Sequence, residues 1–172
     1  MELPPQLRQA VDSALAGVSV TELTVAARAL SQRYREEVRD GRLHISSDRI
    51  ALAYIATRMP ATYAAIHAAL SALAQQQPAF APRSLLDVGA GPGTVMWAAA
   101  DIWPEIEAAM LVETSPAIRA LGEQLAMSSS IARISWRAAD LRSDLPDMQH
   151  DLVTLAYVLD ELAPKDRGAT NA

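Results

Sequence analysis

The chain contains 172 residues, of which 51% are hydrophobic and 20% are charged, so it is long and apolar enough to form a packed core. It has no cysteine, which excludes disulfides, a thiolate nucleophile and any metal or cluster that cysteine would ligate. The net charge of −5 gives no overall electrostatic reason to expect nucleic-acid binding.

The charge is distributed unevenly along the chain. Residues 1–83 carry nine arginines and seven acidic residues, whereas residues 84–172 carry six basic and thirteen acidic residues. An acidic second half suits a cationic ligand, and it equally suits a solvated surface. The first residues lack a basic region followed by an apolar run, and no apolar run is long enough to span a bilayer. We therefore expect a cytoplasmic protein with no membrane partner.

The first 80 residues predict a series of helices. A short amphipathic stripe follows two prolines near the start and is closed by Gly17. Ser19 and Glu22 have the spacing of a capping box and start a second helix. A third helix starts near residue 47, and Pro60 interrupts it or restarts it as a fourth. We expect residues 1–80 to form an N-terminal helical region.

From residue 81 onward, short apolar runs alternate with helical patterns. Strands are predicted at residues 84–88, 109–113, 134–138 and 151–157. Helices are predicted over residues 94–100 and from Pro116, with Ser115 as the cap. Strands that alternate with helices imply right-handed crossovers and a parallel sheet. The predicted fold class is therefore α/β, with a partial Rossmann-like sheet over residues 81–172.

A glycine-rich turn separates the first predicted strand from its helix. Gly89 allows a sharp turn, Gly91 allows a ligand to lie against bare backbone, and Gly93 allows the helix to pack closely on the strand. A nicotinamide-type fingerprint would need a glycine where Thr94 stands. Asp87 ends the strand, where an acid can hold the ammonium group of an amino-acid ligand.

Two further acids follow the next strands. Glu113 ends the second predicted strand, twenty-four residues after the first glycine of the turn, which places its carboxylate beside ribose hydroxyls. Asp140 follows the third strand, where an acid can accept from an adenine amino group. Together with Asp87, these acids converge on one crevice and predict a nucleoside-type ligand. The alternatives are a tight turn without a ligand, a solvated Glu113, and an Asp140 that belongs to the loop surface with Asp144 and Asp147.

With the segment Asp87–Gly93 the chain resembles the class I S-adenosylmethionine-dependent methyltransferases. Through Arg58–Ala65 and Leu155–Leu162 it more narrowly resembles the methyltransferase-like family associated with the mitochondrial small ribosomal subunit and its bacterial relatives. The resemblance covers nearly all of residues 1–162. It implies S-adenosylmethionine as the cofactor, and the small ribosomal subunit or its rRNA as a partner. The cofactor-binding residues that it implies are Asp87, Gly89, Ala90, Gly91, Gly93, Glu113 and Asp140.

The sequence departs from the family pattern after the fourth strand. The methyltransferase sheet has seven strands, and the four that fit here imply the order 3-2-1-4. Cysteines that bind a metal cluster in family members are absent, so we expect no metal. We expect the chain to be truncated at its C-terminal end. The fourth strand is almost continuously apolar, which is typical of a strand buried on both faces, so we expect a second copy of the chain to cover it as a homodimer.

The catalytic residues stay open at this point. Tyr157, Asp160 and Glu161 are the candidates near the transferred methyl group, and packing or the start of a helix explains them equally well. Lys165 is the only lysine, which argues against a lysine-centred ribose-methylating site. The Arg28–Arg49 stretch suits contacts with rRNA phosphates, although its interleaved acids favour a solvated helix face.

Three functions follow from these patterns. The chain is an enzyme that methylates rRNA or protein, or it is a non-catalytic ribosome-assembly factor whose cofactor pocket is structural. A third alternative is a small-molecule methyltransferase in which residues 1–80 form a helical lid over the cleft.

Overall fold

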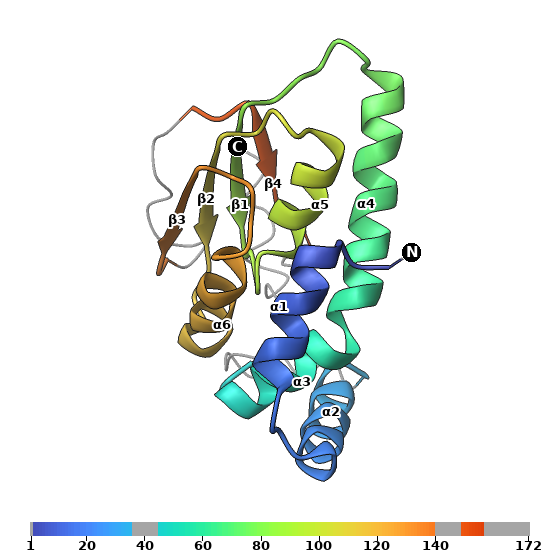
Figure 1. Cartoon of the computed structure of the whole chain (residues 1–172), viewed down its shortest axis with the longest axis vertical. Helices are drawn as coiled ribbons and strands as arrows, with labels where there is room; N and C mark the ends of the chain where they lie inside the picture. The colour runs from blue at the N-terminus through green and yellow to red at the C-terminus, as the bar shows by residue number, and fades with distance from the viewer. Residues whose placement is uncertain (1, 36–44, 140–148, 157–172) are drawn as a thin grey trace, which may run out of the picture.

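A computed structural model of the chain describes residues 2–35, 45–139 and 149–156 (Figure 1). Four helices come first along the chain: α1 (Pro5–Leu15), α2 (Val20–Arg35), α3 (Asp48–Thr57) and α4 (Met59–Gln76). Strands and helices then alternate: β1 (Ser84–Val88), α5 (Thr94–Ile102), β2 (Ala108–Val112), α6 (Pro116–Ala126), β3 (Arg133–Arg137) and β4 (Leu152–Thr154). The predicted sequence of helical region followed by α/β region is therefore confirmed.

The four strands form one parallel sheet in the order β3-β2-β1-β4. This order and the parallel arrangement confirm the predicted fold class. In the register of the sheet, Leu86 lies between Met110 on β2 and Val153 on β4. The strand predicted at residues 84–88 is found with the same bounds, whereas β4 is shorter than its predicted range of 151–157. Tyr157, the end of that range, lies outside the described residues.

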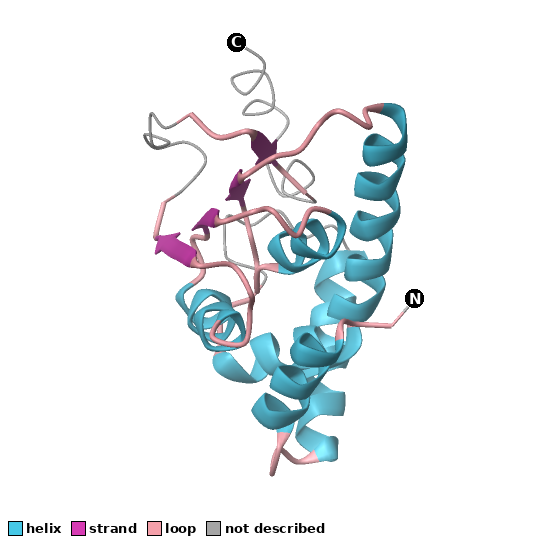
Figure 2. Ribbon diagram, turned by 45° about the horizontal axis from the view of Figure 1, so that its top comes forward, coloured by secondary structure: helices cyan, strands magenta, loops and turns pink. Residues whose placement is uncertain are grey.

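The two faces of the sheet differ in what covers them. The described helices pack on one face of the sheet (Figure 2). Leu85, Leu111 and Trp136 belong to the apolar core on this face. A smaller apolar cluster occupies the other face, made by Leu86, Val88, Met110 and Val112. The larger core is continuous from α1 to α6, so the helices of the N-terminal region and the helices of the α/β region bury their apolar side chains together. The predicted boundary near residue 80 falls between α4 and β1.

Polar contacts fix the N-terminal helices to the two helices of the α/β region. On α4, the Tyr63 hydroxyl donates to Asp101 Oδ2 of α5 at 3.1 Å, and His67 Nε2 lies 3.0 Å from the same oxygen. Burial, followed by the nearby Asp101 carboxylate, raises the pKa of Tyr63, so its hydroxyl keeps its proton. At the start of α6, the buried Ser115 Oγ donates to the Ile45 carbonyl at 2.6 Å. The helical region therefore holds both helices that follow the central strands.

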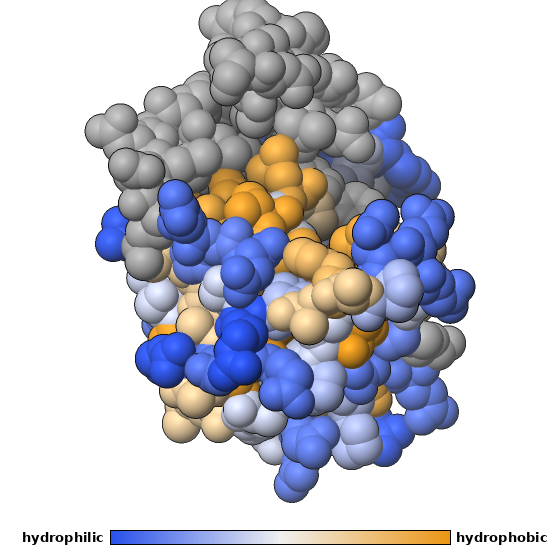
Figure 3. Space-filling model, turned by 90° about the horizontal axis from the view of Figure 1, so that it is seen from above, coloured by the Kyte–Doolittle hydropathy of each residue, from blue (hydrophilic) through white to orange (hydrophobic). Residues whose placement is uncertain are grey.

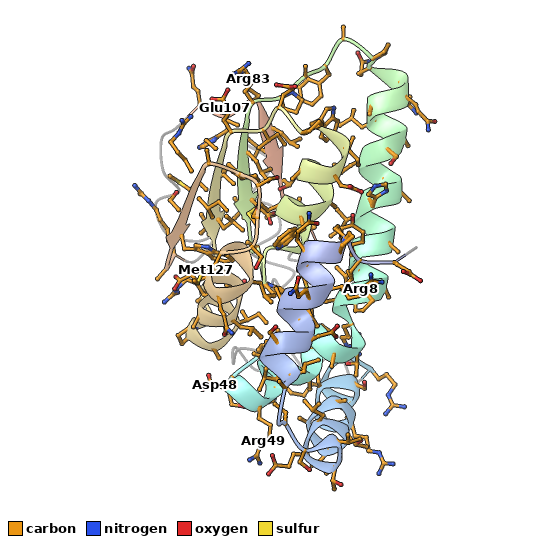
Figure 4. The ribbon with its side chains drawn as sticks, viewed as in Figure 1. Arg8, Asp48, Arg49, Arg83, Glu107 and Met127 are labelled. Carbon is orange, nitrogen blue, oxygen red and sulfur yellow. The ribbon has the colours of Figure 1, made fainter. Side chains whose placement is uncertain are left out.

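A network of charged residues joins the amino ends of the strands. Asp151 Oδ2 accepts from the backbone N–H groups of Arg83 and Ser84 at 2.8 and 2.9 Å, which ties β4 to β1. The Arg83 guanidinium pairs with Glu107, and Figure 4 shows the two side chains together at this edge. Arg133 lies 3.6 Å from the same carboxylate. The ion pairs lie at the amino ends of the strands, and the glycine-rich turn lies at the opposite, carboxyl ends.

Helix starts follow the predicted residues, with two differences in their hydrogen bonds. The Glu22 N–H donates to Ser19 Oγ at 3.5 Å, while the Glu22 side chain accepts from Arg49 at 3.2 Å. Ser115 stands at the predicted cap position of α6 but makes no capping bond, and its hydroxyl instead donates to the Ile45 carbonyl. In both cases a partner distant in sequence takes the side chain away from its local helix.

The edge strand β4 bears on the predicted homodimer. β4 pairs with β1 through three residues, and its middle residue, Val153, is 60% exposed on the face opposite the helices. An open strand edge with an exposed apolar residue favours pairing with another strand. Seen from above, hydrophilic side chains cover most of the described surface and a hydrophobic group gathers near its centre (Figure 3). The homodimer through β4 stays a prediction.

No single described helix is both long and apolar enough to cross a membrane, although α1 and α2 meet the length and composition criteria as a pair bent by 108°.

We expect Ser115→Ala to lower the free energy of unfolding by about 1–3 kcal/mol, because it removes a buried hydrogen bond and leaves the Ile45 carbonyl without this donor. Denaturant unfolding of the purified chain measures the change. Ser128→Ala is the matched control, because Ser128 is exposed beyond the end of α6 and its loss should have little effect. Equal stability of the two variants would show that the bond between the helical region and α6 contributes nothing.

Candidate cofactor-binding site

The glycine-rich turn has the backbone conformation that its residues predict. Gly89, Gly91 and Gly93 have φ values of 71°, 55° and 82°, in the left-handed region that favours glycine. The N–H groups of Gly89 and Ala90 donate to the Val112 carbonyl at 2.8 and 3.0 Å. The turn is therefore bonded to the carboxyl end of β2, and the predicted residues Gly89, Ala90, Gly91 and Gly93 lie together at the carboxyl ends of β1 and β2.

Two of these glycines differ in the space around them. A Cβ atom on Gly93 would lie 3.2 Å from Leu111 Cδ2, so the start of α5 packs closely on β2 as the sequence predicts. Among the described residues, a Cβ atom on Gly91 would meet no atom within 4 Å. Open space beside a residue in the left-handed conformation leaves room for a ligand against the Gly91 backbone.

Asp87 is fully buried beneath this turn. Its Oδ1 accepts a hydrogen bond from Thr154 Oγ1 of β4 at 2.8 Å, and its Oδ2 has no hydrogen-bond partner among the described residues. Burial raises the pKa of Asp87 to about 7, the Thr154 bond opposes this rise, and the nearby Glu113 charge adds to it. A buried carboxylate oxygen without a partner is costly, and a cationic group on a ligand would supply the missing partner.

Glu113 follows the last residue of β2 and joins two separate backbone segments. Its Oε2 accepts from the Gly91 N–H at 2.9 Å, and its Oε1 accepts from the Ser115 N–H at 2.7 Å. Burial raises the pKa of Glu113, while these N–H donors and Arg119 oppose the rise. Each carboxylate oxygen has a second acceptor position, so the same group can accept from ligand hydroxyls. This arrangement disfavours the alternative of Glu113 as a freely solvated acid.

Thr94 is a candidate that the sequence reasoning missed. It is the first residue of α5, it is 3% exposed, and within the part of the chain that the structure describes its Oγ1 has no hydrogen-bond partner. Gly93, the cap residue, supplies no side-chain bond to the helix start. The first N–H groups of a helix have no partner within the helix and attract anions, so Thr94 adds a hydroxyl to an anion-binding helix start. A hydroxyl residue directly after the glycine turn was the available signal.

The remaining predicted site residues lie outside the described residues. They are Asp140, Tyr157, Asp160 and Glu161. The segment that precedes Asp140 is described as far as Ala139, whose carbonyl accepts from Thr114 Oγ1 at 2.9 Å. The chain after β3 therefore passes beside the residue that follows Glu113. Within the described ranges, no three His, Asp or Glu side chains are grouped so that they could hold a metal ion.

The described groups around the glycine-rich turn offer three kinds of contact to a ligand. Asp87 offers a buried acceptor to a cation, the start of α5 offers donors to an anion, and Glu113 offers acceptors to hydroxyls. Ammonium, carboxylate and ribose hydroxyl groups occur together in an amino acid joined to a nucleoside. The residues present therefore fit S-adenosylmethionine.

We expect Asp87→Asn to change how stability depends on pH. The folded chain keeps a proton on Asp87 up to about pH 7 that the unfolded chain releases near the ordinary value of 3.8, so this carboxyl lowers the free energy of unfolding as the pH rises between these values. Across this window the free energy of unfolding of the variant should rise relative to that of the wild type, by at most about 1.4 kcal/mol per pH unit. Above the window the difference between the two should stay constant.

Denaturant unfolding from pH 5 to pH 8 tests this expectation, with Asp12→Asn as the control, because Asp12 is an exposed acid on α1. The control should follow the wild-type profile at every pH. Parallel pH profiles for the Asp87→Asn variant and the wild type would show that Asp87 ionises at its ordinary pKa in the folded chain.

Comparison with known proteins gives a consistent family. The family model of the mitochondrial small ribosomal subunit protein Rsm22 matches residues 48–170, which include the turn, Glu113 and all four strands. The human mitochondrial ribosome assembly protein METTL17 is 32% identical over 126 residues, a match that covers 69% of this chain and 27% of METTL17. The chain thus spans about a quarter of the length of this curated relative.

A solved structure with a similar course of the chain is the plantazolicin methyltransferase BpumL in complex with a monoazolic desmethylPZN analog and SAH. It is 17% identical, with a TM-score of 0.45 over 77% of this chain and 47% of that chain. Because the family model matches well over half of the residues, the chain belongs to the family of the mitochondrial small ribosomal subunit protein Rsm22.

Proposed function

We propose that this chain binds S-adenosylmethionine at the carboxyl ends of β1 and β2 and acts in the assembly of the small ribosomal subunit. The observation that carries the cofactor is the pair of acids at one glycine turn, with Asp87 buried and short of a partner and Glu113 bonded to the turn itself. The family match and the relative named as a ribosome assembly protein support the biological role.

In this proposal each part of the cofactor has its own contacts in the chain. The ammonium group is held by Asp87, directly or through a water, and the carboxylate is held by the start of α5 with the Thr94 hydroxyl. The ribose hydroxyls donate to Glu113, and the open space at Gly91 leaves room for the ligand beside the backbone. Asp140 is assigned to the adenine amino group on the resemblance alone. When bound, S-adenosylmethionine supplies a methyl group activated by its sulfonium centre.

The family match and the relative named as a ribosome assembly protein favour an assembly factor over an enzyme as the first candidate. The proposed contacts use Asp87, Thr94 and Glu113 for binding, and the catalytic candidates Tyr157, Asp160 and Glu161 lie outside the described residues. A ligand that binds only the folded chain stabilises it by mass action, so the cofactor can act structurally without turnover. Methylation of rRNA or a ribosomal protein is the alternative, and it is distinguished by transfer of the methyl group.

We expect calorimetry to detect binding of S-adenosylhomocysteine to the purified chain, and we expect Glu113→Ala to weaken it by about tenfold to a hundredfold. A hydrogen bond to a charged group contributes about 1.5–3 kcal/mol, which corresponds to this loss. Binding of 5′-methylthioadenosine should weaken to a similar degree, because this compound keeps the ribose. Glu105→Ala is the control, because Glu105 is an exposed acid outside the turn.

Thr94→Val serves as the contrasting variant in the same experiment. It should weaken binding of S-adenosylhomocysteine by about tenfold to a hundredfold, as expected for one hydrogen bond to a charged carboxylate, and leave binding of 5′-methylthioadenosine unchanged, because that compound lacks the amino-acid part. If the wild-type chain binds neither compound, the cofactor proposal is wrong. If Glu113→Ala binds both as tightly as the wild type does, the crevice at β1 and β2 is not the site.

We expect the chain to sediment with small ribosomal subunits or their precursors from the source organism, and to incorporate no labelled methyl group into them. Sucrose-gradient sedimentation followed by scintillation counting of rRNA and protein measures both results. Methyl incorporation above that of the Glu113→Ala variant would establish the enzyme instead. Absence of the chain from every ribosomal fraction would contradict the assembly role for this segment.

A further inference from the structure

The side chain of Trp136 packs β3, the outer strand opposite β4, against helix α6. Trp136 lies in β3, opposite Leu111 of β2, and its half-buried ring is on the helix-covered face of the sheet. A Cβ atom placed on Gly122 of α6 would lie 2.4 Å from Trp136 Cη2 and 2.9 Å from Cζ2. Real Cβ atoms do not approach other atoms this closely, so only glycine fits at residue 122 with the ring in this place.

The glycine turn meets the same ring. The Cβ position of Gly122 lies 3.1 Å from the Pro92 Cα atom, so α6 contacts the backbone of the turn directly. A Cβ atom on Gly93 would lie 3.6 Å from Trp136 Cη2. Trp136 and Pro92 therefore both lie against Gly122 with no room for a side chain there, and the same ring lies beside Gly93 at ordinary contact distance for an added Cβ atom.

The indole nitrogen of Trp136 indicates that the ring acts by packing and not by a polar contact. Trp136 Nε1 is buried and has no hydrogen-bond partner, a cost that phenylalanine would avoid. The benzo part of the indole, which carries Cζ2 and Cη2, is the part that reaches Gly122 and Gly93. The contribution of Trp136 is therefore its size and shape, and it makes no described polar contact with its ring.

Two anchors thus hold the turn from one side. Glu113 holds Gly91 by a hydrogen bond and also holds the N–H of Ser115 next to the first residue of α6. Two helical turns further along α6, Gly122 packs against Pro92. The ring of Trp136, from β3, packs against Gly122 and lies beside Gly93. We infer that Trp136 is a positioning residue that holds the backbone of the glycine turn in the conformation that binds its ligand, and that Gly122 is the residue of α6 against which its ring packs. This inference rests on the proposed function for the identity of the ligand.

A double-mutant cycle tests the inference with the full chain, using Gly122→Ala, Trp136→Phe and the double variant. Phenylalanine lacks the ring atoms that an alanine at residue 122 would meet, so the second substitution makes room for the first. Alanine also favours a helix more than glycine does, so a loss in Gly122→Ala must come from displaced neighbours. Trp103→Phe is the control for losing a buried tryptophan elsewhere, because Trp103 packs against Phe80 away from the turn.

Two readouts are needed, namely the affinity for S-adenosylhomocysteine by calorimetry and the amide resonances of Gly91 and Gly93 without ligand. Gly122→Ala should weaken binding by about tenfold and shift both resonances, because overpacking moves backbone. The double variant should restore affinity to within about threefold of the wild type. The Trp103→Phe control should leave both resonances unchanged.

The inference is overturned if Gly122→Ala leaves the resonances and the affinity unchanged and lowers only the unfolding midpoint, because Trp136 is then ordinary core. It is also overturned if the double variant binds no better than Gly122→Ala. Should Gly122→Ala not fold, Trp136→Phe alone decides through its affinity for S-adenosylhomocysteine, which should fall because the smaller ring no longer packs at Gly122, and an unchanged affinity overturns the inference. If no protein binds the ligand but the resonances shift and recover as expected, the positioning role stands and the cofactor proposal fails.

Discussion

The Glu113 carboxylate is the interaction on which the candidate site depends, because it joins two backbone segments that the sequence separates. One oxygen accepts from Gly91 in the turn after β1, and the other accepts from Ser115 at the start of α6. Bonding to both segments fixes the glycine turn relative to the start of α6. The same carboxylate keeps acceptor positions for ligand hydroxyls, so structure and binding use one group.

Asp87 imposes the opposite energetic condition. Its full burial, with one oxygen lacking a partner, disfavours the charged form and raises its pKa to about 7. A ligand ammonium would relieve this cost, so the folded chain without ligand holds a destabilised acid that binding would satisfy. The N-terminal helices offset such costs through the core that they share with α5 and α6, and through the Ser115 bond to Ile45.

The sequence predicts most of the fold because the decisive signals are local. Alternating apolar runs and glycines locate β1 and the turn, and the order of the strands follows from the family resemblance. The missed features are contacts between residues distant in the chain. Thr154 of β4 donates to Asp87 of the neighbouring strand β1, Ser115 bonds to Ile45 instead of capping its own helix, and no local pattern indicates either bond. The structural part of the Glu113 role was missed for the same reason.

We infer that the turn from Gly89 to Thr94 and the segment at Ser115 form one ligand-binding site, because Glu113 is hydrogen-bonded to both. The most direct measurement is an NMR titration of the isotope-labelled chain with S-adenosylhomocysteine. We predict saturable shifts of the amide resonances of Gly91, Gly93, Thr94 and Ser115, all with the same dissociation constant, because one bound ligand perturbs both segments that Glu113 joins. An unchanged spectrum, or shifts confined to residues away from this turn, would contradict the account.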